Sequence, residues 1–261
     1  MRAIALPPTL AALLLGAALP LAAQDVAAHL AAGDTARCAR SSPAALAHFR
    51  EALALDSLNY EANWKASREL TDIGKLMPDA ERTQRDSVYA EALALARRAV
   101  RIDSLGADGH YMVAVAAGRV ALTKSAKERV RSARLVRDEA LRAVELDPRH
   151  DGALHVLGRW NAEIMRLPGI TKFFARTFLG ASIFGAASWD SATIYFDRAI
   201  QLNPQNIYHH LDLAESLIDD DHQAQARPHL QEVARLPLGC DVGDPSYKQR
   251  AAELLQKITR R

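Results

Sequence analysis

The chain has 261 residues and an almost balanced charge, with 33 lysines and arginines against 31 acidic residues and a formal net charge of +2. This balance argues against a general nucleic-acid binder, which needs a strongly basic surface. Hydrophobic residues make up 49% of the chain, which is enough for a sizeable core. After the N-terminal segment no stretch is apolar for long enough to cross a bilayer, so we expect no transmembrane segment in the mature chain.

The first 23 residues have the pattern of a secretory signal peptide. Arg2 is the sole positive charge near the start, an apolar stretch covers residues 10–19, and small residues precede a cut ahead of Gln24. The alternative, an uncleaved membrane anchor, fits less well because the apolar run is short and prolines interrupt it. We therefore expect residues 1–23 to be removed and residues 24–261 to be exported, to the periplasm if the source is a double-membraned bacterium.

Small residues recur five times at the same register of a helix-forming stretch, and this recurrence is the most informative feature of the sequence. Small side chains there let two antiparallel helices approach closely, and a larger apolar one fills the hole between neighbouring pairs. The matching residues are Ala45, Phe49 and Ala52; Ala92, Ala96 and Ala99; Val136, Ala140 and Ala143; Ala192, Phe196 and Ala199; and Ala226, Leu230 and Val233. The pattern resembles the second helix of tetratricopeptide (TPR) repeats, whose period is about 34 residues.

The segments that follow the first four stretches are near copies of one another. They lie at 55–57, 102–104, 146–148 and 202–204, and read Leu-Asp-Ser, Ile-Asp-Ser, Leu-Asp-Pro and Leu-Asn-Pro. Asp, Asn, Ser and Pro at these places stop one helix and cap the next. The exits fall at Ser57, Ser104, Pro148, Pro204 and Leu238, so successive intervals are 47, 44, 56 and 34 residues. Because the excess lies between the two helices of a repeat, we predict three elongated hairpins.

The first helices of the repeats keep the same phase. The pattern falls on His29, Ala32, Gly33 and Ala36; on Leu154, Leu157, Gly158 and Asn161; and on His210, Leu213, Ala214 and Leu217. An amphipathic tail over 245–258 is expected to cover the apolar face of the last repeat. We therefore predict an all-α fold: one TPR-like α-solenoid domain over 24–261, with about five helix hairpins and a C-terminal capping helix. The alternative is an alanine-rich helical bundle without a true repeat.

Several segments in the second half of the chain resemble one family of divergent TPR proteins. They are Ala-Lys-Glu-Arg-Val-Arg at 126–131, Ala-Val-Glu-Leu-Asp-Pro at 143–148, Leu-Gly-Arg-Trp at 157–160, a helix-forming insert at 170–184, and Tyr-Phe-Asp-Arg-Ala at 195–199 with its exit at 202–204. In this order, over about residues 110–257, the chain resembles the regulator of microtubule dynamics family. The Leu-Gly-Arg-Trp element is moderately specific, and the rest is common to TPR proteins.

The resemblance implies an α-helical TPR domain, no catalysis and a binding or tethering role. Eukaryotic members are linked to microtubules and organelle membranes. This chain departs from them because it starts with an export signal, and an exported bacterial relative would meet no microtubule. Only the fold and partner binding are therefore carried over.

The two cysteines, Cys38 and Cys240, lie at opposite ends of the predicted array. An oxidising compartment would permit a disulfide. An open solenoid, however, would hold its ends much farther apart than the limit of about 7 Å between the Cα atoms of bonded cysteines. We therefore expect no intramolecular bond, while pairing between two molecules stays open.

Motifs of common enzyme classes are missing from the sequence, which has no HExxH, no G-x-S-x-G elbow, no P-loop and no G-x-G-x-x-G. We therefore expect no catalytic residues and no cofactor. A metal site could be drawn from the densest polar group, which comprises His209, His210, Asp219, Asp220, Asp221, His222 and His229. We interpret the aspartates instead as a solvated turn that caps the helix starting near His222, and predict no metal site. His150 and His155 flank a helix start and are interpreted as surface polar residues, not a catalytic pair.

The first helices of a TPR array line a concave groove where peptides or helices dock. The polar candidates for contact with a protein or peptide partner are Asn63, Lys65, Arg119, Arg159, Asn161 and His209. Arg119 and Arg159 could hold a carboxylate in a fork, although Arg159 is equally suited to pair with Glu163 one turn on. A non-enzymatic scaffold or adaptor is therefore the leading functional hypothesis.

Two other segments favour an alternative partner, a lipid or another amphiphile. The basic run over 124–137, counted together with the adjoining Asp138, has a local net charge of +4 and could contact an acidic partner or phospholipid headgroups. The insert over 170–184 holds four of the six phenylalanines and could form an apolar lip. The residues of this hypothesis are Lys124, Lys127, Arg131, Phe173, Phe174 and Phe178. The simpler interpretation is that the basic run is a solvated helix face and that the insert packs across neighbouring repeats.

Overall fold

The computed structural model describes residues 21–121, 126–168 and 182–260. Within these ranges every regular element is helical. The α-helices are α1 (Leu21–Cys38), α2 (Ser42–Leu55), α3 (Tyr60–Leu76), α4 (Arg82–Ile102), α5 (Ala107–Ala121), α6 (Ala126–Leu146), α7 (Asp151–Arg166), α9 (Trp189–Leu202), α10 (Ile207–Asp219), α11 (Gln223–Arg235) and α12 (Asp244–Thr259). Two short 3-10 helices are η1 (Asp79–Glu81) and η2 (Ser182–Ala186). None of the described helices is long and apolar enough to span a bilayer.

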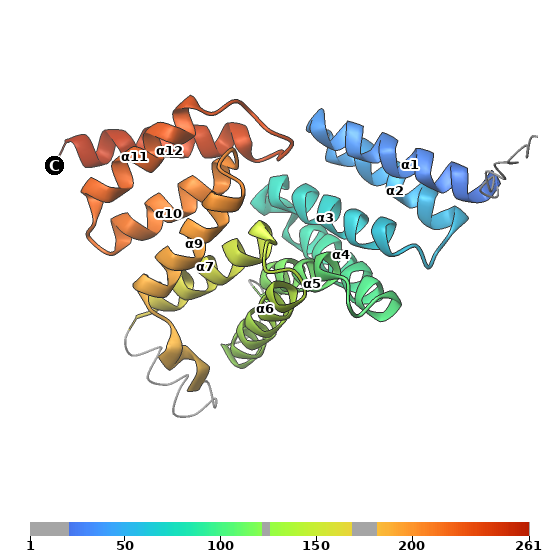
Figure 1. Ribbon diagram of the computed structural model, residues 1–261, viewed down its shortest axis with the longest axis horizontal. Helices are drawn as coiled ribbons and strands as arrows, with labels where there is room; N and C mark the ends of the chain where they lie inside the picture. The colour runs from blue at the N-terminus through green and yellow to red at the C-terminus, as the bar shows by residue number, and fades with distance from the viewer. Residues whose placement is uncertain (1–20, 122–125, 169–181, 261) are drawn as a thin grey trace, which may run out of the picture.

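In the described ranges the α-helices pack as five successive antiparallel hairpins followed by α12 (Figure 1). The hairpins are α1–α2, α3–α4, α5–α6, α7–α9 and α10–α11. Helix α12 packs on α10 and α11 and buries Ala251, Leu254 and Ile258 against them. Helices α4 and α6 have 21 residues each against 14 in α2, which elongates the second and third hairpins. The predicted all-α solenoid with a capping helix is therefore confirmed.

The small-residue register predicted from the sequence lies at the contacts between helices. The alanines without exposed surface include Ala52, Ala99, Ala143 and Ala199. In the fourth hairpin, a Cβ added to Gly158 would lie 2.8 Å from the ring of Phe196, which is also fully buried. Gly33 faces the ring of Phe49 in the same way in the first hairpin. Small residues therefore give the aromatic rings the space in which they pack.

The near-identical exit sequences fold into near-identical turns. The backbone N–H groups of Asp56, Asp103, Asp147 and Asn203 each donate to the carbonyl of the alanine four residues earlier, at 2.9 Å. In the first three turns the aspartate Oδ1 also accepts the N–H of the residue two positions on, at 2.9 to 3.0 Å. These side-chain bonds satisfy backbone donors that the ended helix leaves free. Each exit therefore stops one helix and sets the start of the next.

The two ends of the array meet, contrary to the expectation for an open solenoid. Cys38 at the end of α1 and Cys240 between α11 and α12 form a disulfide, with their Cα atoms 4.0 Å apart. The expectation that these cysteines lie too far apart to bond is therefore wrong. Small rotations between repeats add up along a solenoid, and here they bring the segment between α11 and α12 back to α1 (Figure 1). The solenoid is thus closed into a ring.

Candidate functional site

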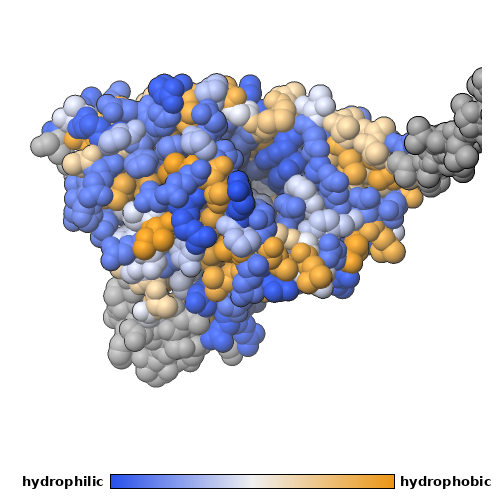
Figure 2. All heavy atoms as spheres, in the orientation of Figure 1, coloured by the Kyte–Doolittle hydropathy of each residue, from blue (hydrophilic) through white to orange (hydrophobic). Residues whose placement is uncertain are grey.

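The first helices of the five hairpins form a continuous layer, which we call the inner wall: α1, α3, α5, α7 and α10. Helix α3 contacts α5, α5 contacts α7, and α7 contacts α10. Tyr111 on α5 lies within electrostatic reach of Asp151 on α7, Arg37 on α1 and Asp241 beside α12. Figure 2 shows a hollow near the centre of the molecule, bordered by hydrophilic residues. The inner wall is therefore the place where residues from distant repeats converge.

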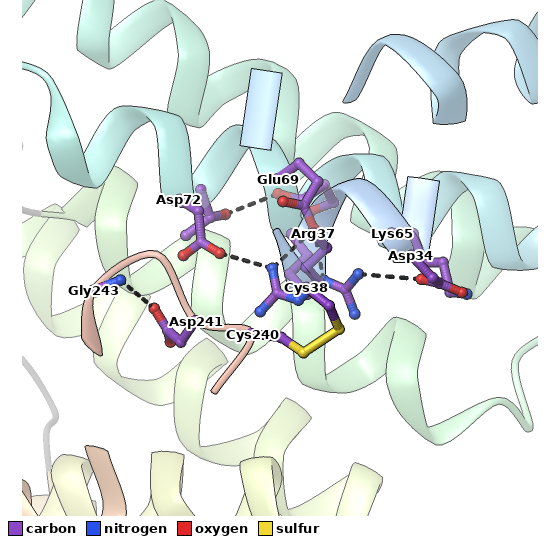
Figure 3. Close-up of polar contacts among 12 residues, drawn as sticks. Asp34, Arg37, Cys38, Lys65, Glu69, Asp72, Cys240, Asp241 and Gly243 are labelled. Atoms are coloured by element: carbon purple, nitrogen blue, oxygen red, sulfur yellow. Dashed lines mark hydrogen bonds and ion pairs between the residues drawn. A yellow bond between two sulfur atoms is a disulfide. The ribbon is translucent and has the colours of Figure 1, made fainter. Parts of the chain in front are cut away.

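The N-terminal half of the inner wall carries a dense network of ion pairs (Figure 3). Arg37 Nη1 lies 2.9 Å from both Glu69 Oε1 and Asp72 Oδ2. Arg68 Nε contacts the same Glu69 oxygen at 2.9 Å. Burial would raise the pKa of Asp72, but the positive charges of Lys75 and Arg37 hold it below its usual range. Because both carboxylates have cationic partners, the network fixes α1 against α3.

The disulfide and the polar contacts around it form a closing seam between the two ends of the ring. Lys75 Nζ lies 3.1 Å from Asp241 Oδ1 and donates to Tyr247 Oη, also at 3.1 Å. Arg40 donates to the carbonyl of Gly239 at 3.0 Å. Figure 3 shows the disulfide beside the ion pairs of α1 and α3. The closing seam therefore combines a covalent bond with charged contacts from both ends of the chain.

The C-terminal half of the inner wall is crossed by a chain of buried and half-buried ionisable groups between α7 and α10. His209 Nε2 lies 3.0 Å from Asp151 Oδ2, and His209 Nδ1 lies 3.0 Å from His155 Nδ1. His155 Nε2 is 3.2 Å from Asp212 Oδ2, and Arg159 Nη1 is 3.4 Å from the same oxygen. Burial lowers the pKa of His155 to about 4. Because His155 is only 5% exposed, its interpretation as a surface residue is wrong.

Four of the six predicted partner-contact residues are buried, namely Asn63, Lys65, Asn161 and His209, and three of these hold the local backbone or a buried histidine contact. Asn63 has no exposed surface, and its amide donates to two carbonyls of the preceding turn at 3.2 and 2.7 Å. Asn161 donates to a carbonyl one turn earlier at 2.9 Å and accepts the N–H of Ser188 at 3.3 Å. His209 belongs to the buried chain of ionisable groups. These three side chains hold helices and turns in place.

The other three predicted residues lie on the inner wall with different surroundings. Lys65 is buried as well, and its ammonium pairs with Asp34 on α1. Arg159 lies 3.6 Å from Glu163, so the internal pair predicted for it is present. Arg119 is half-buried in the last turn of α5, and no carboxylate of the described residues lies within 4.0 Å of it. Arg159 is therefore engaged within the chain, and a carboxylate held by Arg119 and Arg159 stays a prediction.

A cavity of about 290 Å³ opens between α7, α10 and α12, and sequence reasoning missed it. Its lining residues are Glu163, Arg166, Glu215, Ile218, Asp219, Arg250, Leu254 and Lys257. Two ion pairs border it, Arg166 with Asp219 and Arg250 with Glu215, each at 2.7 Å. The only signal in the sequence was the amphipathic tail, which becomes α12. The cavity needs three helices to exist, so no local pattern could have indicated it.

Most residues of the lipid hypothesis lie outside the described residues. Those are Lys124, Phe173, Phe174 and Phe178. Lys127 and Arg131 lie on α6, where Arg131 is exposed. Phe184, at the end of the Phe-rich insert, is buried beside Trp160 with ring centroids 6.3 Å apart, and Arg137 of the basic run lies 5.6 Å over the same Trp160 ring. The described ends of both segments therefore take part in internal packing.

The dense histidine and aspartate group is split into separate contacts. His210 Nδ1 lies 3.2 Å from His229 Nδ1, while His222 pairs with a neighbouring aspartate at 3.1 Å. Across the described ranges, no group of three or more His, Cys, Asp or Glu side chains is arranged to hold a metal ion. The aspartates do form a turn, in which Asp221 has φ of 61°, but no side chain caps α11, so that part of the interpretation is wrong. His150 instead caps α7 by accepting a backbone N–H at 3.1 Å.

Comparisons with known proteins point to one family. The family described as "Regulator of microtubule dynamics protein 1-3" matches residues 29–259. Regulator of microtubule dynamics protein 1 of Bos taurus is 26% identical over 153 residues, which cover 59% of this chain and 47% of that protein. The Homo sapiens protein of the same name is 25% identical over 145 residues, covering 56% and 45%. The chain thus spans about half the length of the curated relatives it matches.

A solved structure supports the fold independently. The crystal structure of a thermophilic TPR protein from Thermus thermophilus superposes with a TM-score of 0.64 at 16% sequence identity. The match covers 88% of this chain and 99% of that one. At this identity the likeness establishes the TPR architecture and nothing about a partner.

Proposed function

Because the chain belongs to the regulator of microtubule dynamics family, we propose that it is a non-enzymatic TPR scaffold that binds a protein segment on its inner wall. TPR arrays bury each repeat against its neighbours and leave one curved surface open to partners. The observation that carries the proposal is the cavity between α7, α10 and α12, where Ile218 and Leu254 lie among paired charges. Such a site suits an apolar side chain of a peptide whose polar groups meet the charged border.

We also propose that the scaffold works in an exported compartment. Residues 1–23 have the pattern of a signal peptide. The disulfide between Cys38 and Cys240 supports the same location, because disulfides persist mainly in oxidising compartments. Expression in a Gram-negative host followed by periplasmic release should yield a chain that begins at Gln24 by intact-mass measurement. Recovery of an uncleaved chain in the cytoplasm would contradict the proposal.

The binding function can be tested with a displayed library of random peptides and the disulfide-bonded chain. Wild type is expected to select peptides that share an apolar residue. Ile218→Arg places a long charged group in the cavity and should weaken binding of a selected peptide at least about tenfold, because its apolar side chain loses its site. Ile194→Arg is the matched control, since Ile194 is 58% exposed on the outer helix α9. Thermal melting of both variants checks that each is folded.

Two outcomes would count against the proposal. Equal binding by Ile218→Arg and wild type would show that the peptide does not bind at the cavity. Lipid mass spectrometry of the same purified protein tests the alternative partner. If one phospholipid co-purifies with each chain and no peptide is selected, the chain is a lipid-binding protein and not a peptide-binding scaffold.

A further inference from the structure

Lysine and arginine side chains on the inner wall are almost all neutralised within the chain. Of the seven on the described first helices, six lie within 4.0 Å of a carboxylate: Arg37, Lys65, Arg68, Lys75, Arg159 and Arg166. The seventh is Arg119 on α5, which has no such partner among the described residues. A guanidinium held partly out of water gains most when an anion meets it. Within the described ranges, Arg119 is thus a cation without an ion-pair partner.

Arg119 also interrupts a row of acidic residues. Counted from the start of each helix, the thirteenth residue is acidic on three inner-wall helices: Asp72 on α3, Glu163 on α7 and Asp219 on α10. On α5 the thirteenth residue is Arg119. The three carboxylates are paired, Asp72 with Lys75 at 3.0 Å and the other two with Arg166 at 3.0 and 2.7 Å. Among the described residues, Arg119 is therefore the one charge of this row without an ion-pair partner, and it is positive.

The side of α5 that carries Arg119 faces the ring. The buried residues of α5 are Gly109, His110, Met112, Val113, Ala114, Ala116 and Ala117. Partly open positions include Tyr111, Val115 and Arg119, which follow one another at four-residue steps along one side of the helix. Helices α3, α4, α6 and α7 cover the other sides. The open stripe of α5, with Arg119 at its end, therefore belongs to the inner wall.

A second donor lies close to Arg119. Tyr89 on α4 is 5% exposed, with its ring against Gly74, and its hydroxyl makes no hydrogen bond to another described residue. Helices α4 and α5 are antiparallel neighbours, which places Tyr89 near the start of α4 at the level of the last turn of α5. Burial raises the pKa of Tyr89, and among the charges that oppose this rise Arg119 acts most strongly. Arg119 and Tyr89 are therefore neighbours, and no described residue pairs with the guanidinium of Arg119 or bonds to the hydroxyl of Tyr89.

We propose that Arg119 and the hydroxyl of Tyr89 anchor a carboxylate of the protein segment bound to the inner wall. This inference rests on the proposed function and adds the chemistry of the partner. A guanidinium gives a carboxylate two parallel N–H bonds, and a phenol adds an O–H donor. One guanidinium and one hydroxyl hold a single carboxylate, so the fit is to a segment with an isolated aspartate, glutamate or C-terminal carboxylate.

The test uses peptides that the disulfide-bonded chain selects from a displayed random library. Selected peptides are expected to share one acidic position. Arg119→Ala in the protein and Asp→Asn or Glu→Gln in the peptide should each weaken binding about tenfold, and together no more than either alone. Tyr89→Phe, which removes one neutral donor, should cost about threefold. Arg198→Ala is the matched control, because Arg198 is exposed on the outer helix α9.

Failure of the carboxylate anchor and failure of the proposed scaffold function give different outcomes. A peptide that loses binding on C-terminal amidation, but not on Asp→Asn, assigns the carboxylate to its C-terminus and supports the inference. Selected peptides without a shared acidic group, or unchanged binding by Arg119→Ala, would overturn the inference while the scaffold function stands. If wild type selects no peptide at all, the scaffold function fails and the inference fails with it.

Discussion

Single glycines set how closely the two helices of a hairpin approach. A Cβ added to Gly158 would meet the fully buried ring of Phe196 at 2.8 Å. Gly158→Ala should therefore lower the free energy of unfolding by about 1–3 kcal/mol, measured by urea titration. Gly118→Ala is the matched control, because the nearest atom to its Cβ, in Val136, is 3.7 Å away. It should be neutral or stabilise by up to about 1 kcal/mol, and equal loss in both variants would contradict this account.

A buried histidine makes stability depend on pH. Burial lowers the pKa of His155 to about 4 from its ordinary 6.5, so between these values the unfolded chain binds a proton that the folded chain does not. The free energy of unfolding should therefore fall as the pH drops from about 6.5 to 4, by roughly 2–3 kcal/mol. Burial would raise the pKa of Asp151, but hydrogen bonds from His209 and Asn203 lower it to about 2. Protonation of Asp151 therefore lowers the free energy of unfolding further below about pH 4.

Urea unfolding across this pH range, with His155→Gln beside wild type, tests the assignment. In the variant the free energy of unfolding should depend less steeply on pH between 6.5 and 4, because the imidazole of His155 is gone. Some slope remains, since burial also lowers the pKa values of His210 and His229. The full wild-type slope in the variant would show that His155 is not the group that titrates.

Helices and turns could be predicted from the sequence where their interactions are local. The exit turn at Asp103 uses only residues within four positions, so its pattern is visible in the chain itself. Local patterns could not tell which polar side chains of the inner wall are buried and which are open. Asn63 and His155 are polar like Arg119, yet both are buried, Asn63 against the turn before α3 and His155 against residues of α10. Which polar side chain stays open depends on contacts with helices that are distant in the sequence.

The fourth hairpin can be disrupted as a unit. Ala199 has no exposed surface, and α9 packs on α7 and α10. Ala199→Arg should unfold the α7–α9 hairpin, because a long charged group cannot be accommodated there. Hydrogen exchange should accelerate in α7 and α9 while α1 to α4 keep their protection, since each repeat contacts mainly its neighbours. Arg198→Glu, on the exposed side of α9, should exchange like wild type, and an unchanged melting temperature for Ala199→Arg would contradict the register.

Closure of the ring is a property of the whole molecule, and this is why the sequence did not predict it. The distance between Cys38 and Cys240 depends on the sum of many small rotations between helices, none of which leaves a mark in the local pattern. The bond joins residues separated by 202 positions. Constraint of so long a loop in the unfolded chain is worth about 5 kcal/mol in the chain-entropy description.

The Cys38→Ser, Cys240→Ser double variant should therefore unfold at a lower urea concentration than the oxidised wild type. Reduced wild type should behave like the variant, which separates loss of the bond from the effect of the substitutions. Each is expected to lose several kcal/mol of unfolding free energy, with about 5 kcal/mol as the upper figure. Coincident unfolding curves for variant and oxidised wild type would mean that the bond does not form in solution.

A covalent link between residues 38 and 240 also changes what one proteolytic nick can do. Cleavage of one peptide bond anywhere between these residues leaves both fragments joined by the disulfide, and only its reduction removes the covalent link between them. After the same cut, the two fragments of a chain without this disulfide would be held together only by non-covalent packing. The molecule therefore stays in one piece after damage that would divide a linear polypeptide.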